Sequence, residues 1–328
     1  MTTQTKLNNP AMGIGLILIA IVAISINDML IKLLSGGYPL HQMVFIRSSI
    51  GICFSLLFVQ LEGGWGILKT KTPFLHLLRG LLIVVANLSF FAALASLPLA
   101  DTTAIAFVAP LVITLLSIPM LGEKVGPLRI GAVLVGFVGV IIVIQPWQGS
   151  DARDVPFVIY LLPLLAAVTY ALNSLMTRML GVASKASAMA VYIQMTFIVV
   201  SLLFWIVAGD GRYAEGLENE SLIFILRAWV WPEGSDIWFF LALGLNSAIV
   251  GYTLAAAYRM ADAATIAPFE YVGLPLAIMW GWAIFGDLPG TVATIGIALI
   301  LGSGLFVFVR ERQKKRRVVS DRRINRRY

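Results

Sequence analysis

Charged residues are scarce in this sequence. Asp, Glu, Lys and Arg make up only 12% of its 328 residues, whereas 59% are hydrophobic. Soluble domains carry about 25% charged and about 45–50% apolar residues. The chain therefore has too little polar surface to cover a water-soluble globule of its length, which excludes a soluble enzyme and a disordered protein. A membrane-spanning helix needs about 20 mostly apolar residues, so about ten spans would fit.

Cysteine and histidine are nearly absent. The only cysteine is Cys53 and the only histidines are His41 and His76, which excludes an internal disulfide and predicts no metal site. The sequence also lacks the GxxxxGK[ST] phosphate loop, the GxSxG elbow, the HExxH pair and the CxxC cluster. These absences exclude ATP as an energy source bound by this chain and leave no recognisable catalytic machinery. We therefore predict a protein that is not an enzyme and that holds no cofactor or metal.

The net positive charge is concentrated at one end of the chain. Residues 310–328 contain ten Lys or Arg and two acidic residues, while the rest of the chain is close to neutral. A basic tail directly after an apolar span is typical of attraction to an anionic cytoplasmic leaflet. We predict that residues 311–328 form a basic cytoplasmic tail that meets anionic lipid and does not bind nucleic acid.

Long apolar windows predict an all-α integral membrane protein with ten transmembrane helices, because spanning segments must pair every backbone polar group internally. The predicted spans are 12–34, 40–60, 73–95, 100–119, 127–145, 157–179, 187–207, 237–259, 264–285 and 290–310. Prolines in or near these spans predict local kinks; they are Pro110, Pro119, Pro163, Pro268 and Pro275. The connection 208–236 is unusually long, and its segment from Ser221 to Trp231 predicts an outer interfacial helix, with a lid as the alternative.

Lys and Arg are distributed unevenly between the two sets of connections. One set carries Lys6, Lys69, Lys71, Lys124, Arg129, Arg178, Lys185, Arg259 and the tail, and the other carries Lys32, Arg153, Arg212 and Arg227. Because cytoplasmic connections are enriched in basic residues, we predict that both termini are cytoplasmic and that the protein is a multi-pass component of the cytoplasmic (inner) membrane.

The sequence repeats weakly at consistent offsets. At an offset of 146, Asn27 falls on Asn173 and Ser55–Phe58 falls on Ser201–Phe204, and the segment LADTTAIA (99–106) is similar to MADAATIA (260–267). Five spans in each half place the second copy upside down relative to the first. Such inverted repeats are typical of secondary transporters, whose substrate site lies near the midplane between the repeats. The predicted units are a first five-helix repeat, 12–145, and a second, 157–310.

Polar residues inside the spans are the candidate functional residues, because each is costly in hydrocarbon unless it faces a partner or a wet cavity. Asp28 and Arg47 lie about 10 Å deep from one face by helix rise, with Asn27 beside them. Glu270 lies at a comparable depth from the other face, between two prolines. The substrate-binding or coupling candidates are Asn27, Asp28, Arg47, Arg79, Asn87, Asn173, Gln194, Asn246, Tyr252, Glu270, Tyr271 and Trp280.

Structural explanations compete with these functional ones. A buried asparagine in a helix bundle is as often a packing hydrogen bond as a ligand contact, which applies to Asn27 and Asn173. Asp28 is one helical turn from Lys32, so the structural alternative for Asp28 is a simple ion pair with Lys32. Glu270 has a structural alternative in an ion pair with Arg79. Glycines in the fifth and tenth predicted spans favour close packing, within a monomer or across a homodimer.

Several segments carry a family resemblance. LPLADTTAIAFVAPLVITLLSIPMLGEKVG followed by RIGAVLVGFVGVIIVIQP resembles the EamA family of the drug/metabolite transporter superfamily, and ADAATIAPFEYVGLPLAIMWGWAIFGD with IGIALILGSG is similar to the same pattern more loosely. The resemblance covers nearly the whole chain. It implies ten helices, cytoplasmic termini, a central cavity and movement of small organic metabolites by alternating access. It implies no particular substrate residue, because no residue motif fixes the substrate across this family. The second half also departs from the first around Glu270, which weakens the argument for a symmetric site.

These observations predict a secondary transporter for a small polar or zwitterionic metabolite, with a planar aromatic part as one option. In this hypothesis Glu270 and Asp28 are the proton-coupling carboxylates, and Arg47 and Arg79 are anion contacts or counter-ions. A membrane scaffold or sensor that signals through the basic tail, and a membrane-embedded enzyme, are the alternatives. The scaffold is the weaker reading, because the sequence contains no large soluble partner domain.

Overall fold

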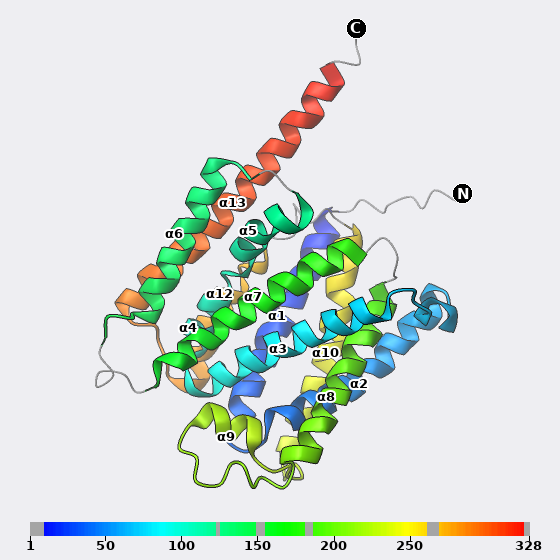
Figure 1. Cartoon of the computed structure of the whole chain (residues 1–328), viewed down its shortest axis with the longest axis vertical. Coiled ribbons are helices and arrows are strands. Elements are labelled where there is room, and N and C mark those ends of the chain that lie inside the picture. The colour runs from blue at the N-terminus through cyan, green and yellow to red at the C-terminus, as the bar shows by residue number, and fades with distance from the viewer. Residues whose placement is uncertain (1–9, 123–124, 149–154, 181–185, 261–268, 325–328) are drawn as a thin grey trace.

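The computed structural model describes residues 10–122, 125–148, 155–180, 186–260 and 269–324, and within them every regular element is a helix (Figure 1). The long helices are α1 (Pro10–Leu34), α2 (Leu40–Glu62), α3 (Pro73–Ser96), α6 (Pro127–Ile144), α7 (Phe157–Leu180), α8 (Ala186–Ala208), α10 (Asp236–Met260) and α13 (Thr291–Ile324). The shorter ones are α4 (Leu99–Ala106), α5 (Ala109–Leu121), α9 (Glu220–Leu226), α12 (Gly273–Trp280), the 3₁₀ turn η1 (Trp65–Leu68) and the π-helical turn η3 (Gly281–Phe285).

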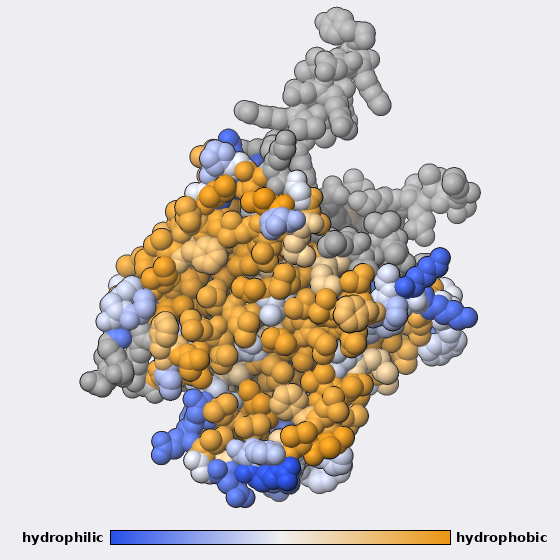
Figure 2. All heavy atoms as spheres, viewed as in Figure 1, coloured by the Kyte–Doolittle hydropathy of each residue, from blue (hydrophilic) through white to orange (hydrophobic). Residues whose placement is uncertain are grey.

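Nine helical segments among the described residues are long and apolar enough to cross a membrane, one of them being α4 together with α5. A shorter apolar helix covers Gly273–Phe285. Apolar side chains cover most of the surface in Figure 2, and hydrophilic residues gather around α9 and at the margins. Large side chains such as Leu61 (74% exposed) and Ile206 (68% exposed) would not face water at this density,. The chain is therefore a multi-pass α-helical membrane protein.

Proline interrupts one of the predicted spans. The span predicted at 100–119 is divided, because α4 ends at Ala106 and α5 begins at Ala109, with Pro110 in its first turn. Proline lacks the N–H that would continue the helical ladder. The predicted kink at Pro110 is confirmed, whereas α5 and α7 continue through Pro119 and Pro163.

The first residues of the ninth predicted span, 264–285, lie outside the described residues, and Pro268 is among them. From residue 269 onward it consists of the short helix α12, which contains Pro275, and the π-helical turn η3. The helix of the tenth predicted span, 290–310, runs further than its apolar sequence, because α13 continues to Ile324 (Figure 1).

The first and last helices fix two reference ends of the bundle. Helix α1 begins and α13 ends at the same end, which we call the terminal end (Figure 1). Helix α9 lies at the opposite end, which we call the α9 end. A chain that starts and finishes at one end has crossed the bundle an even number of times.

The predicted interfacial helix from Ser221 to Trp231 is shorter and more buried than expected. Helix α9 starts after Asn219, whose side chain accepts a hydrogen bond from Leu222 N at 3.1 Å, and it ends at Leu226. Arg227 is already extended, with φ −66° and ψ 158°. Phe224 is only 1% exposed, whereas Trp231 is 89% exposed. The helix is therefore shorter than the segment from which it was predicted and buries one aromatic residue against the protein, while its position at the membrane interface stays a prediction.

Helices from the two halves of the chain pair closely. The most extensive contacts join α1 with α10, α3 with α7, α2 with α8 and α6 with α13. Helix α6 crosses α13 at Gly139 and Gly296, where a Cβ atom on Gly139 would lie 2.8 Å from the carbonyl oxygen of Gly296. These two glycines therefore serve packing within one chain, whereas Gly131 and Gly302 face open space.

Candidate functional site

A cavity of about 460 Å³ lies inside the bundle, between the two halves of the chain. Its lining comes from α1, α2, α3, α4, α5, α7, α8, α10 and the segment just before α12. The polar lining residues are Asn27, Asp28, Arg47, Asn87, Thr103, Tyr170, Gln194, Ser247 and Glu270. The rest of the lining is apolar, as expected of a small-molecule site with a few placed polar groups.

Arg47 organises the part of the cavity nearest the α9 end. Its guanidinium donates to Asn27 Oδ1 at 3.3 Å and to Asn87 Oδ1 at 3.1 Å. Asn27 in turn donates to Asp28 Oδ1 at 3.2 Å. Helices α1, α2 and α3 are thus joined by one network, which includes a cation and a carboxylate inside the bundle. Fixed dipoles of this kind compensate the cost of placing charge in a low-dielectric interior.

Two aromatic rings also hold Arg47. Its guanidinium carbon lies 6.0 Å from the ring centre of Phe91 and 5.7 Å from that of Phe197. A guanidinium is attracted to the negative face of an aromatic ring within about 6 Å. Because the amides and the rings fix its position, Arg47 forms the positively charged boundary of the cavity towards the α9 end. We call this boundary the Arg47 ceiling.

The lining nearer the terminal end contains Gln194, Tyr170 and Glu270. Gln194 packs where α2 comes close to α8, since a Cβ on Gly51 would lie 2.8 Å from Gln194 Nε2. Tyr170 has 47% of its surface exposed although it lies in the middle of α7. Tyr170 also lines the cavity, so a ligand there would contact its side chain.

Aromatic rings form much of the apolar wall. Those lining the cavity are Phe90, Phe91, Phe107, Tyr170 and Phe197. Planar rings on several sides favour a ligand with a flat, polarisable part, because offset or edge-on aromatic contacts add to simple area burial. The wall therefore suits a planar ligand better than a purely aliphatic one.

The structure brings six of the twelve candidate residues together in this cavity: Asn27, Asp28, Arg47, Asn87, Gln194 and Glu270. Of the rest, Asn246 donates to the backbone carbonyl of Ala23, which joins α10 to α1. Trp280 donates to Ser25 Oγ at 3.2 Å. Both of these side chains hold helices together.

The other four candidates also lie outside the lining. Tyr271 is 8% exposed and packs against Phe107, with ring centres 5.5 Å apart. Tyr252 is 51% exposed and stacks on Phe58 at 5.0 Å. Arg79 donates to the carbonyl of Met189 at 2.9 Å, and Asn173 is buried in α7.

Lys32 excludes one structural explanation for Asp28. Its ammonium donates to the carbonyls of Leu94 at 3.0 Å and Leu97 at 2.5 Å, and it lies 5.3 Å from the ring centre of Phe285. Lys32 therefore caps the C-terminal end of α3, where free carbonyls attract a cation. The simple Asp28–Lys32 pair is not formed.

Sequence reasoning missed several lining residues, among them Thr103, Tyr170, Phe197 and Ser247. Tyr170 precedes the candidate Asn173 by three residues on α7, which is close to one helical turn. Asn173 itself lies outside the lining, so spacing from it does not predict that Tyr170 faces the cavity. Phe197 and Ser247 lie close in the sequence to the candidates Gln194 and Asn246, but that spacing alone does not show which side of each helix faces the cavity.

Comparison with known proteins agrees with this architecture. The sequence pattern of the EamA-like transporter family matches residues 11–145. A riboflavin transporter of Rhizobium johnstonii is 30% identical over 86% of this chain and 85% of its own length. The chain belongs to the EamA-like transporter family. An S-adenosylmethionine uptake transporter of Rickettsia felis is 27% identical, covering 92% of this chain and 94% of its own length.

One solved crystal structure has the same fold. It superposes with a TM-score of 0.62 at 20% sequence identity and covers 92% of this chain and 98% of its own. The family membership and the cavity together identify the chain as a small-metabolite transporter, as the sequence predicted.

Proposed function

We propose that this protein is a secondary transporter that carries a small polar metabolite with a planar aromatic part through the central cavity by alternating access. The observation that carries this proposal is the cavity itself, which has aromatic walls, an arginine–amide ceiling and a carboxylate at each end. Its volume of about 460 Å³ falls in the range of about 300–1,000 Å³ that is typical of small-molecule sites.

Symmetric helix pairing supports two inverted five-helix repeats at 12–145 and 157–310. If α1, α2, α3, α4–α5 and α6 correspond in order to α7, α8, α10, α12–η3 and α13, the contact of α1 with α10 corresponds to that of α7 with α3. The pairs α2–α8, α4–α12 and α6–α13 each map onto themselves. A pseudo-twofold axis in the membrane plane produces this pattern, with the substrate site on the axis.

A flavin-like compound is the first substrate class to test. The ceiling presents hydrogen-bond donors of Arg47, which match the carbonyl oxygens of an uncharged planar heterocycle, and the aromatic wall matches the rings. The relative named as a riboflavin transporter points the same way. The carboxylates of Asp28 and Glu270 favour a second class, a cationic adenosyl compound, which agrees with the relative named for S-adenosylmethionine.

Proton coupling through Glu270 and Asp28 completes the proposal. Both carboxylates line the cavity, where access from one side at a time would let each exchange a proton with one compartment. Arg47 would then be a counter-ion or anion contact, while Arg79 lies outside the cavity lining and is a weaker candidate for that role.

The orientation of the chain follows from its charge distribution. The excess of Lys and Arg in connections of the terminal end, together with the basic tail, favours a cytoplasmic terminal end in the cytoplasmic membrane. The tail 311–328 would then meet anionic lipid. Either a monomer or a homodimer is compatible with the intrachain packing of α6 and α13.

Uptake into proteoliposomes tests the proposal. Purified protein in sealed liposomes is given riboflavin, S-adenosylmethionine and a panel of amino acids, with and without an imposed proton gradient. We expect saturable uptake and counterflow of one planar compound. Purified protein that neither binds nor exchanges any compound would instead favour the scaffold or the membrane-enzyme alternative.

A further inference from the structure

We infer that the segment 209–235, which contains α9, is a releasable gate that closes the central cavity at the α9 end. The inference rests on the proposed transport function and adds the way access to the site is controlled. Three successive layers of contacts separate the cavity from the α9 end: the Arg47 ceiling, an apolar plug and the segment 209–235 itself.

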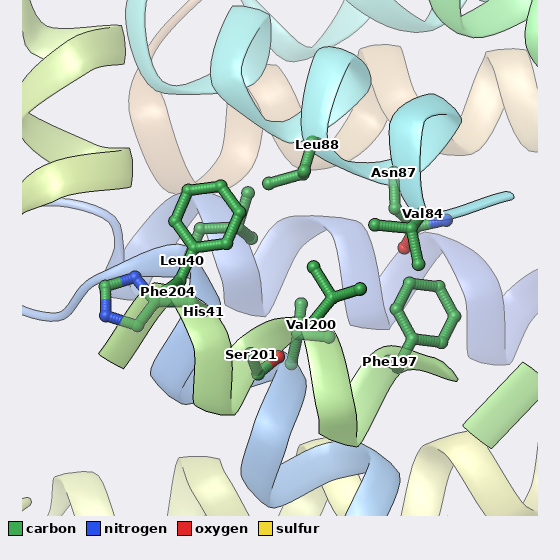
Figure 3. A pocket seen from close by; sticks show the side chains of 10 residues that line it. Leu40, His41, Val84, Asn87, Leu88, Phe197, Val200, Ser201 and Phe204 are labelled. Atoms are coloured by element: carbon green, nitrogen blue, oxygen red, sulfur yellow. The ribbon is translucent and has the colours of Figure 1, made fainter. Parts of the chain in front are cut away.

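The apolar plug lies directly beyond Arg47. The side chains labelled in Figure 3 come from α2, α3 and α8. The void between them has a volume of only about 20 Å³. The residues around it are Leu40, His41, Val44, Val84, Asn87, Leu88, Phe197, Val200, Ser201 and Phe204. Asn87 and Phe197 also line the central cavity, so the plug begins where the cavity ends. Its void is too small for a metabolite.

Gln42 holds the gate segment against α2. Its side-chain amide donates to the carbonyl of Val230 at 2.6 Å and accepts from Val230 N at 3.1 Å. Gln42 is only 4% exposed. The adjacent His41 lines the plug and has Nδ1 3.1 Å from the carbonyl of Ile225. Plug and gate segment are therefore in direct contact.

Two further contacts fix the segment to other helices. Arg227 donates to the carbonyls of Ser35 and Gly36 in the α1–α2 connection. Ser221 donates to the carbonyl of Ala92 at 2.6 Å and lies 2.6 Å, Oγ to Oγ, from Ser96 on α3. Phe224 inserts between these anchors and is 1% exposed. The segment thus ties α1, α2 and α3 together over the plug.

The chemistry of these contacts suits repeated opening. Most are single hydrogen bonds from a side chain to a backbone group, each worth about 0.5–1.5 kcal/mol net. Their partners lie at the α9 end, where water can satisfy them once they separate. Opening the gate also exposes Phe224 and separates Trp229 from the rings of His41 and Phe45. A substrate that binds the open state more tightly than the closed state shifts this equilibrium by its differential affinity.

A disulfide across the gate tests the inference. Ser96→Cys and Ser221→Cys replace the two hydroxyls that already touch, in a Cys53→Ser background. Ala86→Cys, which lines the cavity on α3, is the reporter. A membrane-impermeant maleimide is added on the α9 side, and the rate at which it labels residue 86 is measured. The measurement is made first with the 96–221 disulfide oxidised and then after the disulfide is reduced. This reading needs no substrate, so it is independent of whether a transported compound is found.

We expect oxidation to slow labelling of residue 86 about tenfold or more, as for a local opening equilibrium shifted by at least 1.4 kcal/mol, and reduction to restore it. Gln42→Leu, which removes both amide bonds at similar size, is expected to speed labelling. The matched control carries Gln145→Cys and Gln148→Cys, whose side chains meet at 2.7 Å in the turn after α6 and should have no effect when oxidised. Equal labelling in the oxidised and reduced gate variant, or no labelling in either, would overturn the inference.

Discussion

At the scale of single residues, Arg47 shows how a transporter can keep a cation inside a membrane. Two amide oxygens, from Asn27 and Asn87, accept its hydrogen bonds, and two phenyl rings flank it. The nearest carboxylate in this network, Asp28, is reached through Asn27. The direct hydrogen-bond partners of the guanidinium are therefore neutral amides.

Glu270 is the residue whose substitution tests coupling. Glu270→Gln keeps the size and hydrogen bonding of the side chain and removes its titration. We expect accumulation driven by a proton gradient to disappear while exchange of substrate across the membrane persists, because exchange needs no net proton movement. Gradient-driven uptake and counterflow in the same proteoliposome preparation measure the two quantities.

Asp28→Asn is the matched variant on the other side of the cavity, because it also removes one carboxylate. If both variants accumulate substrate as the unaltered protein does, neither carboxylate carries the coupled proton. A loss of folding yield and of exchange in Glu270→Gln would instead indicate a structural role for this residue.

At the scale of elements, tight glycine contacts decide how closely the helices pack. A Cβ on Gly139 would lie 2.8 Å from the carbonyl oxygen of Gly296. We expect Gly139→Ala to lower the free energy of unfolding by about 1–3 kcal/mol, because α6 and α13 must move apart. Thermal unfolding of the purified protein in one detergent measures the change.

Gly131 provides the control on the same helix. A Cβ there meets no atom within 4 Å, so Gly131→Ala should be neutral or stabilising by up to about 1 kcal/mol. Equal destabilisation by both substitutions would show that the loss comes from α6 itself and not from its contact with α13.

The gate segment illustrates a different kind of element, one held by polar anchors. Tyr38 donates to Asp236 Oδ2 at 2.8 Å and accepts from Glu233 N at 3.2 Å, which fixes the end of the segment to the start of α10. Burial raises the pKa of Tyr38, and the neighbouring Asp236 carboxylate adds to the shift. The phenol therefore stays protonated, and this anchor persists, throughout the physiological pH range.

At the scale of the whole molecule, topology is the property to verify. Helix α1 begins and α13 ends at the same end of the bundle (Figure 1). If the chain crosses the membrane ten times, the connection between α6 and α7 lies on the opposite side of the membrane from the two termini. Reporter fusions at Arg153, in that connection, and at Tyr328 should therefore give opposite readings, with Tyr328 cytoplasmic.

The same reading at both positions would exclude ten crossings and, with them, the inverted repeat. Opposite readings with Tyr328 outside would keep the repeat and reverse the orientation. The fusions thus separate the count of spans from the direction in which the protein is inserted.

Some of the site was predictable because its signal is local. Asn27, Asp28, Arg47 and Glu270 stand out in the sequence, since a polar residue inside an apolar span is costly and uncommon. Arg79 stands out in the same way, yet its guanidinium points to Met189 on α8. Depth along a helix is readable from the sequence, but the direction in which a side chain faces is not.

The sequence by itself determined the membrane environment, the helical class and the positions of most spans. The reason is that the length of an apolar run is a local property, and a run must match the bilayer thickness to span it. It also contained the family resemblance. Only the tertiary structure decided that Tyr170 and Phe197 face the cavity, that Lys32 caps α3, and that α9 docks over the plug. Those outcomes depend on how helices far apart in the chain rotate and cross. Close contacts such as that of Gly139 with Gly296 determine the crossing, and no local sequence pattern encodes such contacts.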